Sequence, residues 1–283
     1  MTDRPVQTLL KQVRRAHEQR QPLVMGIVNV TPDSFSDGGR FDRPDRAVAH
    51  ALQLVAEGAD ILDIGGESTR PGARNVSLDE ELERVVPVIR SLVGRTDVPI
   101  SIDTSKPQVM RAAVEAGAVM INDVNGLRAD GALATAAGLE AAICVMHMQG
   151  QPRTMQQDPQ YDDVVADVMD FLRQRVAACQ AAGIARERLL IDPGFGFGKT
   201  LAHNLALLNR QQELLVLDLP LLIGISRKSM LGAITGRENA DQRLAASLAA
   251  ALLSAQRGAA ILRVHDVAPT VDALKVLGAI ERL

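Results

Sequence analysis

Aromatic residues are scarce in this chain of 283 residues: they make up 2% of it, and tryptophan is missing altogether. Because hydrophobic residues still reach 47%, the interior has to be packed mainly with aliphatic side chains. A strong excess of charge is also lacking, since the formal net charge is -3. Proteins that bind nucleic acids normally carry a basic surface. We therefore expect no nucleic acid among the partners, and an anionic substrate would need a local cluster of positive charge.

Cysteine is rare too. The two cysteines, Cys144 and Cys179, have no metal-ligand spacing, so we expect buried thiols and no zinc site. No run approaches the roughly 20 apolar residues of a membrane span, and residues 1–20 lack the apolar centre of a secretory signal. These features predict a soluble protein of the cytoplasm without a membrane partner.

The chain does contain eight apolar runs, each ending in polar or charged residues and most separated by a stretch with helical periodicity. The runs cover residues 23–31, 60–68, 98–105, 119–126, 141–148, 189–194, 221–229 and 259–267. Strands that are buried on both faces and alternate with helices form parallel sheets. Eight of them, in a chain long enough for one barrel of about 250 residues, predict an α/β fold. We expect a single (β/α)₈ TIM barrel domain over residues 1–283.

The stretches between the runs have apolar residues at helical spacing. We expect helices over 43–58, 77–95, 105–116, 130–137, 161–182, 200–213, 240–257 and 268–281, and an extra N-terminal helix over 5–20 that closes the bottom of the barrel. Ser77 followed by Glu80 is typical of a capping box. The connections 29–42 and 65–76, after the first and second strands, are long and rich in Gly, Pro, Ser and Asp. Such loops on a rigid scaffold often carry function.

In a (β/α)₈ barrel the chemistry lies at the carboxyl ends of the strands, so the polar residues there form the candidate site. Arg263 and His265 are two positions apart on the last strand and therefore share one face. They could be solvated charges, but barrels commonly bind phosphate after strands seven and eight. Asn29 ends the first strand, beside the eighth, and could join them directly or through a metal ion. We therefore expect an anion site of Arg263, His265 and Asn29.

Carboxylate and amide groups end other strands. Asp103 and Asp192 would be costly to bury without a partner; structural salt bridges are one explanation, and a ligand is the other. With Asn122 they offer several acceptors deep in the mouth, which suits a flat heterocycle with N–H groups along one edge. Lys228 could reach a carbonyl or ring nitrogen of this ligand, and a Schiff base is disfavoured because the lysine has polar neighbours. Asp63 is interpreted as a support for the second loop and is left out of the site.

The segment GFGFGKT at 194–200 is close to a phosphate-binding loop, but Pro193 stands where that motif needs its first glycine. Its glycines are interpreted as a tight turn that lets the backbone approach a ligand, with Phe197 as a ring contact. Met146 and His147 end the fifth strand, and the histidine is as compatible with a structural role as with a catalytic one. A magnesium ion carried by a phosphate ligand is compatible with this set of residues.

In their order along the chain, these strand ends resemble the dihydropteroate synthase family. The resemblance covers residues 23–270. It rests on MGIVNVTPDSFSDGG (25–39), DIGGESTRPGA (63–73), SIDTSKPQV (101–109), INDV (121–124), MHMQGQPRTMQ (146–156), DPGFGFGK (192–199), GISRKS (224–229) and RVHDV (263–267). It implies a transferase that joins 4-aminobenzoate to 6-hydroxymethyl-7,8-dihydropterin diphosphate and releases diphosphate. It also implies Mg²⁺ as the cofactor and a homodimer.

The resemblance further implies where the functional residues of the family fall in this chain. The pterin pocket would contain Asp103, Asn122, Met146, Asp192, Phe197, Gly224 and Lys228. The diphosphate would meet Asn29, Arg263 and His265, and the metal would meet Asn29. The 4-aminobenzoate would meet Phe35, Thr69, Arg70, Pro71 and Ser229. The residues implied to take part in catalysis are Asp103, Lys228, Arg263 and His265.

Two other interpretations are open. A corrinoid-dependent pterin methyltransferase resembles this barrel and its pterin pocket, and a catalytically silent pterin-binding subunit would share the fold. A methyltransferase has no use for a diphosphate site, and a silent subunit is expected to lose loop residues. Because 29–39 and 224–229 are intact, we favour the synthase.

Overall fold

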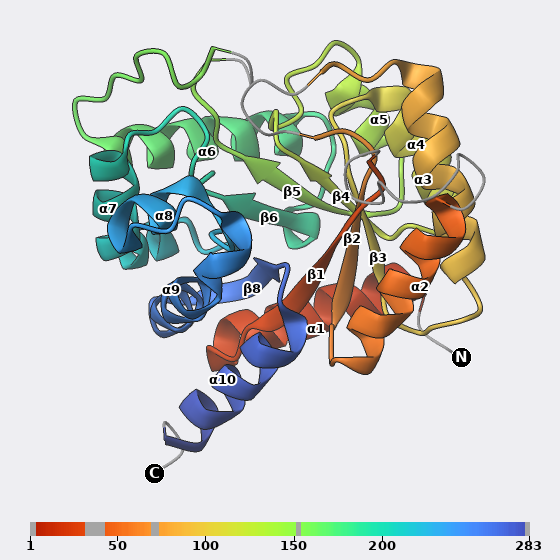
Figure 1. Ribbon diagram of the computed structural model, residues 1–283. Helices are drawn as coiled ribbons and strands as arrows, with labels where there is room; N and C mark the ends of the chain where they lie inside the picture. Colours follow the sequence, from red (N-terminus) through yellow and green to blue (C-terminus); the bar gives the residue numbers. More distant parts are fainter. Residues whose placement is uncertain (1–3, 32–42, 69–73, 151–153, 281–283) are drawn as a thin grey trace.

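Eight parallel strands close into a barrel (Figure 1). The structure is a computed structural model, and it describes residues 4–31, 43–68, 74–150 and 154–280. The strands pair in chain order, and β8 pairs with β1 to complete the ring. Their bounds are β1 Leu23–Asn29, β2 Ile61–Gly65, β3 Ile100–Asp103, β4 Met120–Asp123, β5 Ala142–Met146, β6 Leu189–Asp192, β7 Leu221–Ile223 and β8 Ala259–Val264. The predicted (β/α)₈ class is confirmed.

Helices connect the strands and cover the outside of the barrel (Figure 1). Their bounds are α1 Pro5–Gln19, α2 Arg43–Ala56, α3 Leu78–Leu92, α4 Pro107–Ala116, α5 Ala132–Ala137, α6 Val164–Ala181, α7 Leu201–Asn209, α8 Ser229–Thr235, α9 Leu244–Gln256 and α10 Val267–Ile280, with 3-10 helices η2 Arg186–Arg188, η3 Gln211–Leu217 and η4 Ala240–Arg243. Cys144 in β5 and Cys179 in α6 are buried free thiols, as expected. Among the described residues, no helix has the length and apolar character needed to span a bilayer.

The start of α3 shows how the local sequence determines where an element begins. The Ser77 hydroxyl accepts a hydrogen bond from the Glu80 amide at 3.2 Å, which satisfies one of the free N–H groups of the first turn. The Glu80 carboxylate pairs with Arg74 and Arg84. Ser77 therefore caps the helix as predicted, while Glu80 stabilises its outer side through ion pairs.

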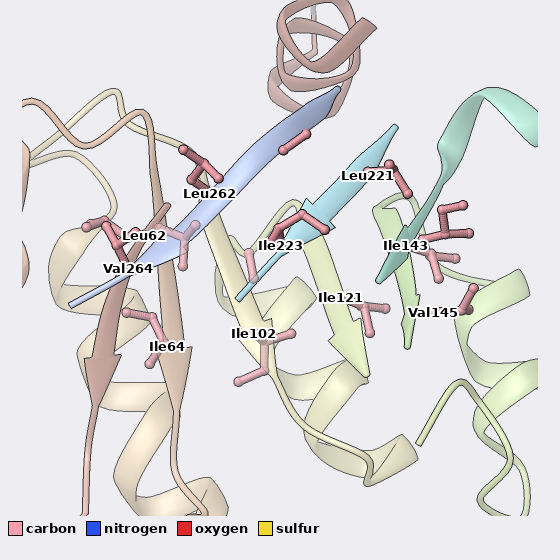
Figure 2. Packing of buried hydrophobic residues seen from close by; sticks show 14 of the residues in the cluster. Leu62, Ile64, Ile102, Ile121, Ile143, Val145, Leu221, Ile223, Leu262 and Val264 are labelled. Carbon is pink, nitrogen blue, oxygen red and sulfur yellow. The ribbon is translucent and has the colours of Figure 1, made fainter. Parts of the chain in front are cut away.

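Successive side chains of each strand alternate between the two faces of the barrel wall. One set packs in the large core under the helices (Figure 2) and includes Leu62, Ile64, Ile102, Ile121, Ile143, Val145, Leu221, Ile223, Leu262 and Val264. The other set points inward and forms, at the amino ends of the strands, an apolar cluster with α1. This cluster includes Val6, Leu9, Leu10, Val13, Met25, Ile61, Met120, Cys144, Leu190, Leu222 and Ile261. α1 thus closes the bottom of the barrel, and the inward positions further along each strand face the mouth.

The seventh strand differs from the prediction. β7 ends at Ile223, whereas the apolar run 221–229 predicted a longer strand. A short helix that the sequence analysis did not include, α8, begins at Ser229, and Lys228 takes its N-cap position. Ile225 is buried although it lies between the two elements. The apolar run continues past the strand because this loop itself packs into the core.

Candidate active site at the barrel mouth

A layer of charged and amide side chains fills the barrel above its apolar bottom. The layer consists of Asp63 of β2, Asp103 of β3, Asn122 of β4, Asp192 of β6 and Arg263 of β8. Four members follow an inward apolar residue by two positions, in the pairs Ile61 and Asp63, Met120 and Asn122, Leu190 and Asp192, and Ile261 and Arg263. The two-residue repeat of a strand therefore aims them into the barrel. The carboxylates and the amide are at most 8% exposed.

Arg263 lies between two carboxylates. Its Nε donates to Asp63 Oδ2 at 2.6 Å, and its Nη2 donates to Asp103 Oδ2 at 2.7 Å. The Asn122 amide also donates to Asp63 Oδ2, at 3.1 Å. Burial lowers the pKa of Arg263, but the two carboxylates outweigh burial and raise it above its ordinary value. The guanidinium is the cation that compensates this buried acidic cluster.

Asp63 belongs to this cluster, although the sequence analysis interpreted it as a loop support. It is fully buried, and its Oδ1 has no hydrogen-bond partner in the part of the chain that the structure describes. The pKa of Asp103 is raised mainly by burial, and the Asp63 charge contributes to the rise although Arg263 opposes it. Strand periodicity could have found Asp63, because it follows the inward Ile61 by two positions.

Asp192 and Lys228 come together where β6 and β7 end. Asp192 Oδ1 accepts a hydrogen bond from the Gly194 amide at 2.7 Å, which orients the carboxylate. Lys228 Nζ donates to the Phe195 carbonyl and lies 4.6 Å from the centre of the Phe197 ring, within the range of a cation–π contact. Burial lowers the pKa of Lys228 to about 8, while Asp192 acts in the opposite direction. A carboxylate, an ammonium group and an aromatic ring are thus combined at one edge of the mouth.

An apolar wall stands beside these polar groups. Its members are Val124, Met146, Met148 and Met155, with Phe197 packed against them. Methionine side chains adapt their shape and pack well against flat rings. A Cβ added to Gly224 would lie 3.8 Å from Arg263 Cβ, an ordinary van der Waals distance, so Gly224 neighbours this β8 residue. Met146, Phe197 and Gly224 are therefore placed around the mouth.

His265 and Asn29 lie at the ends of β8 and β1. His265 Nδ1 is 3.1 Å from the Ser226 hydroxyl oxygen, which also accepts the His265 amide at 3.2 Å. His265 thereby joins the loop after β7 to the end of β8. A Cβ added to Gly65 would lie 3.8 Å from Asn29 Oδ1 and 3.7 Å from Asp103 Oδ2. Asn29 and the Asp103 carboxylate thus lie around Gly65, and His265 lies beside the β7–α8 loop.

His147 has a structural partner that the sequence analysis did not identify. Its Nδ1 is 2.9 Å from Lys199 Nζ, and its ring packs edge-on against Phe171 at 4.9 Å. Burial, and then the charge of Lys199, lower the pKa of His147 to about 2. The imidazole is therefore neutral, and these contacts favour the structural role among the two that the sequence left open.

Several predicted site residues cannot be placed. Phe35, Thr69, Arg70 and Pro71, assigned to 4-aminobenzoate, lie outside the described residues. Ser229 is described: it is exposed and begins α8 next to Lys228.

A closed parallel barrel with buried polar groups at the carboxyl ends of its strands defines a (β/α)₈-barrel enzyme. Comparisons with known proteins narrow this class. The sequence pattern of the family described as "Pterin binding enzyme" matches residues 25–265. The dihydropteroate synthase of Escherichia coli (strain K12) is 53% identical over 258 residues, which cover 91% of this chain and 91% of that protein.

Solved structures agree with the sequence relatives. Xanthomonas albilineans dihydropteroate synthase with 4-aminobenzoic acid has a TM-score of 0.89 and 58% identity, covering 93% of this chain and 94% of that chain. The dihydropteroate synthase of the same organism in complex with 7,8-dihydropteroate has a TM-score of 0.83 and 52% identity, with coverages of 93% and 94%. The chain therefore belongs to the dihydropteroate synthase family of pterin binding enzymes.

Proposed function

We propose that this chain condenses 4-aminobenzoate with 6-hydroxymethyl-7,8-dihydropterin diphosphate to give 7,8-dihydropteroate and diphosphate. The observation that carries the proposal is the buried set of Asp103, Asn122 and Asp192 in the mouth of a barrel whose relatives are dihydropteroate synthases. Buried carboxylates form strong charge-assisted hydrogen bonds with the N–H groups of a heterocycle. The chain is thus a transferase that forms a C–N bond.

The pterin ring is assigned to the polar layer and the apolar wall beside it. Asp192, oriented by its bond from Gly194, accepts N–H bonds from the pyrimidine edge. Lys228 donates to a ring carbonyl or nitrogen, and Phe197, 4.6 Å from the Lys228 ammonium, contacts a face of the ring. Asn122 and Asp103 complete the set of polar groups around the heterocycle.

The reaction needs an activated electrophile more than it needs a base. The arylamine nitrogen attacks the methylene carbon of the pterin, and a C–N bond forms as the C–O bond to diphosphate breaks. Diphosphate leaves with the electron pair, and the nitrogen loses its proton. Cationic and hydrogen-bonding groups at the leaving end stabilise the charge that develops there, and we assign this role to Arg263 and His265. Asp103 stabilises positive charge that spreads from the methylene into the ring.

Oxygen atoms at the mouth fit a magnesium ion that the substrate brings with it. Within the described ranges, no group of three or more His, Cys, Asp or Glu side chains could hold a metal ion by itself. Mg²⁺ is usually bound by one or two protein oxygens together with substrate phosphates. Asn29 Oδ1, which flanks Gly65 beside Asp103, is a suitable oxygen. When bound, Mg²⁺ neutralises charge on the leaving diphosphate.

The second substrate is assigned by the motif match alone. Phe35, Thr69, Arg70 and Pro71 belong to the two long loops, and Ser229 follows Lys228. The related Xanthomonas albilineans enzyme is described with 4-aminobenzoic acid, which supports a site for the same molecule here. Binding at these residues would place the arylamine next to the pterin methylene, since Lys228 belongs to the pterin set.

The catalytic efficiency with the pterin diphosphate is expected to fall as the pH rises through about 8. Burial lowers the pKa of Lys228 to about that value, and the neutral amine can give the pterin only a weaker hydrogen bond than the charge-assisted bond of the ammonium. A pH profile of kcat/KM checks the prediction. Lys228→Met should be slow at all pH values and lack this alkaline decline, whereas Lys275→Met, which removes an exposed lysine of α10, should keep it. The same decline in Lys228→Met would contradict the assignment.

We also propose a homodimer that associates through α7, α8 and α9, which lie together on one side of the barrel (Figure 1). Exposed large hydrophobic residues occur on these helices: Leu201, Leu205, Ile234, Leu244 and Leu253. An exposed apolar surface of this kind is typical of an interface. Sedimentation at several protein concentrations would show a dimer, and a monomer at every concentration would refute the proposal.

The enzyme assay tests the central proposal. Protein supplied with both substrates and Mg²⁺ should form 7,8-dihydropteroate and diphosphate in equal amounts. A corrinoid-dependent methyltransferase would instead exchange a methyl group between a pterin and a corrinoid, and a silent subunit would bind pterin without turnover. Folded protein that binds pterin but forms no dihydropteroate would overturn the proposal.

A further inference from the structure

One buried charged group near the pterin site has no role in the reaction described above. Lys199 follows the glycine-rich turn after β6 and is only 3% exposed. Its Nζ lies 2.9 Å from His147 Nδ1, 2.8 Å from the Gly194 carbonyl and 3.1 Å from the Phe197 carbonyl. All three acceptors are neutral, because His147 is uncharged. The Lys199 ammonium thus connects the glycine-rich turn after β6 to the residue that follows β5.

A buried ammonium without a directly bonded carboxylate is costly. Burial lowers the pKa of Lys199 well below its ordinary value, and Asp192 only partly opposes this effect. An apolar side chain could fill the same space without that cost. The presence of a lysine here therefore indicates that the hydrogen bonds of its ammonium group have a function. The groups that accept these bonds indicate which function.

The backbone of the glycine-rich turn after β6 packs closely against the loop after β5. Gly194 has φ +69°, and a Cβ there would lie 1.9 Å from the His147 carbonyl oxygen. Gly198 has φ +60°, and its Cβ would lie 2.4 Å from the Gln149 carbonyl oxygen. Only glycine fits such close approaches in the left-handed region. The His147 amide also donates to the Asp192 carbonyl at 2.9 Å, so β5 and β6 are tied together at the point where the turn begins.

Two lysines bind the same turn by different carbonyls. Lys199 holds Gly194 and Phe197, whereas Lys228 bonds to Phe195 and lies over the Phe197 ring. The Gly194 amide in turn donates to Asp192. Each group assigned to the pterin on this side of the mouth is therefore attached to backbone that Lys199 fixes.

We propose that Lys199, with neutral His147 as its acceptor, is a positioning residue for pterin binding: it holds the 194–199 turn so that Asp192, Phe197 and Lys228 face the ligand in one arrangement. The inference rests on the proposed function, because it takes the pterin as the ligand of these three groups. Lys199 itself does not contact the reacting atoms.

The first test is Lys199→Met, with calorimetric titration of 6-hydroxymethylpterin. We expect its dissociation constant to rise by about 10-fold or more, equivalent to about 1.4 kcal/mol at 25 °C. At saturating pterin diphosphate, the KM for 4-aminobenzoate should stay within about 2-fold of the wild type, a change of only about 0.4 kcal/mol. Lys275→Met is the matched control for loss of a lysine charge, and it should bind the pterin like the wild type. Unchanged pterin affinity in Lys199→Met, or an equal loss for both substrates, would overturn the inference.

The second test uses His147 and remains decisive if Lys199→Met does not fold. His147→Gln keeps an acceptor for the ammonium, whereas His147→Leu leaves it with one bond fewer. We expect weaker pterin binding in the leucine variant than in the glutamine variant, and equal affinities would refute the role of the contact. The double variant Lys199→Met/His147→Leu should bind about as well as Lys199→Met alone, because contacting residues are not additive. Wild-type protein that fails to bind the pterin would count against the proposed function, not against this inference.

Discussion

Replacing Arg263 by leucine is expected to lower the free energy of unfolding by about 3–5 kcal/mol, because removal of one partner of a buried ion pair leaves uncompensated charge. The change affects two carboxylates at once: Asp63, bonded at 2.6 Å, and Asp103, bonded at 2.7 Å. Both are buried, so water cannot easily replace the guanidinium. Urea unfolding of the variant and the wild type measures the difference.

The pH dependence of stability and a second substitution distinguish two causes of the destabilisation: the loss of charge compensation and the loss of packing. Burial raises the pKa of Asp103 and Arg263 opposes this rise, so in Arg263→Leu the pKa of Asp103 in the folded protein should lie still further above the unfolded value of about 3.9. The stability of Arg263→Leu should therefore increase, relative to the wild type, as the pH falls through this raised pKa, because the folded state takes up a proton before the unfolded state does. Asp63→Asn/Arg263→Leu should regain part of the loss at neutral pH. A loss below about 1 kcal/mol, in the range of an ordinary surface substitution, would contradict the compensating role of Arg263.

The contacts of Arg263 add an effect that its position on the strand did not predict. From the sequence, Arg263 was expected to act on the diphosphate, so its removal would spare a pterin that lacks diphosphate. In the structure Arg263 orients Asp103, which is assigned to the pterin. Loss of Arg263 should therefore weaken both ligands, and more strongly the diphosphorylated one.

The barrel could be predicted because a strand buried on both faces leaves a continuous apolar run. Asn29, Asp103 and Asp192 could also be placed, since each is the last residue of its strand in the structure. Asp63 was missed because it lies inside β2, Ile61–Gly65, and not at its end. How deep a strand residue lies in the barrel, and which residues of other strands surround it, depend on the stagger between the strands of the closed barrel. The sequence of one apolar run does not determine this stagger.

Lys199 and α8 were missed for a different reason. The segment 194–200 was compared with phosphate-binding motifs, but its lysine, Lys199, turns inward to His147, a contact between residues 52 positions apart. The sequence 221–229 was interpreted as one strand because Ile225, buried in the loop, extends the apolar pattern of β7 beyond Ile223. Both errors concern segments whose backbone is irregular although it packs in the interior. In such segments neither the two-residue period of a strand nor the 3.6-residue period of a helix applies.

Asp192→Asn is expected to weaken pterin binding by about 1.5–3 kcal/mol, roughly 10- to 150-fold, while the fold is kept. In the wild type, Oδ1 accepts the Gly194 amide at 2.7 Å. An asparagine would place its side-chain oxygen toward the Gly194 amide, because its NH₂ group would otherwise face that N–H, which is also a donor. The NH₂ group would then face the pterin in place of Oδ2, so that one charge-assisted bond is lost and two donors meet.

Titration of 6-hydroxymethylpterin into the folded variant measures this loss. Asp218→Asn is a matched control: Asp218 is exposed, and its φ of +49° suits asparagine, so the same change of charge should leave both fold and affinity unchanged. The pH adds an independent check. Burial raises the pKa of Asp192, and a protonated carboxyl group accepts less well, so wild-type affinity should decline as the pH falls through that raised value. Asp192→Asn has no such group and should lack this decline, whereas wild-type affinity for the pterin in Asp192→Asn would remove Asp192 from the site.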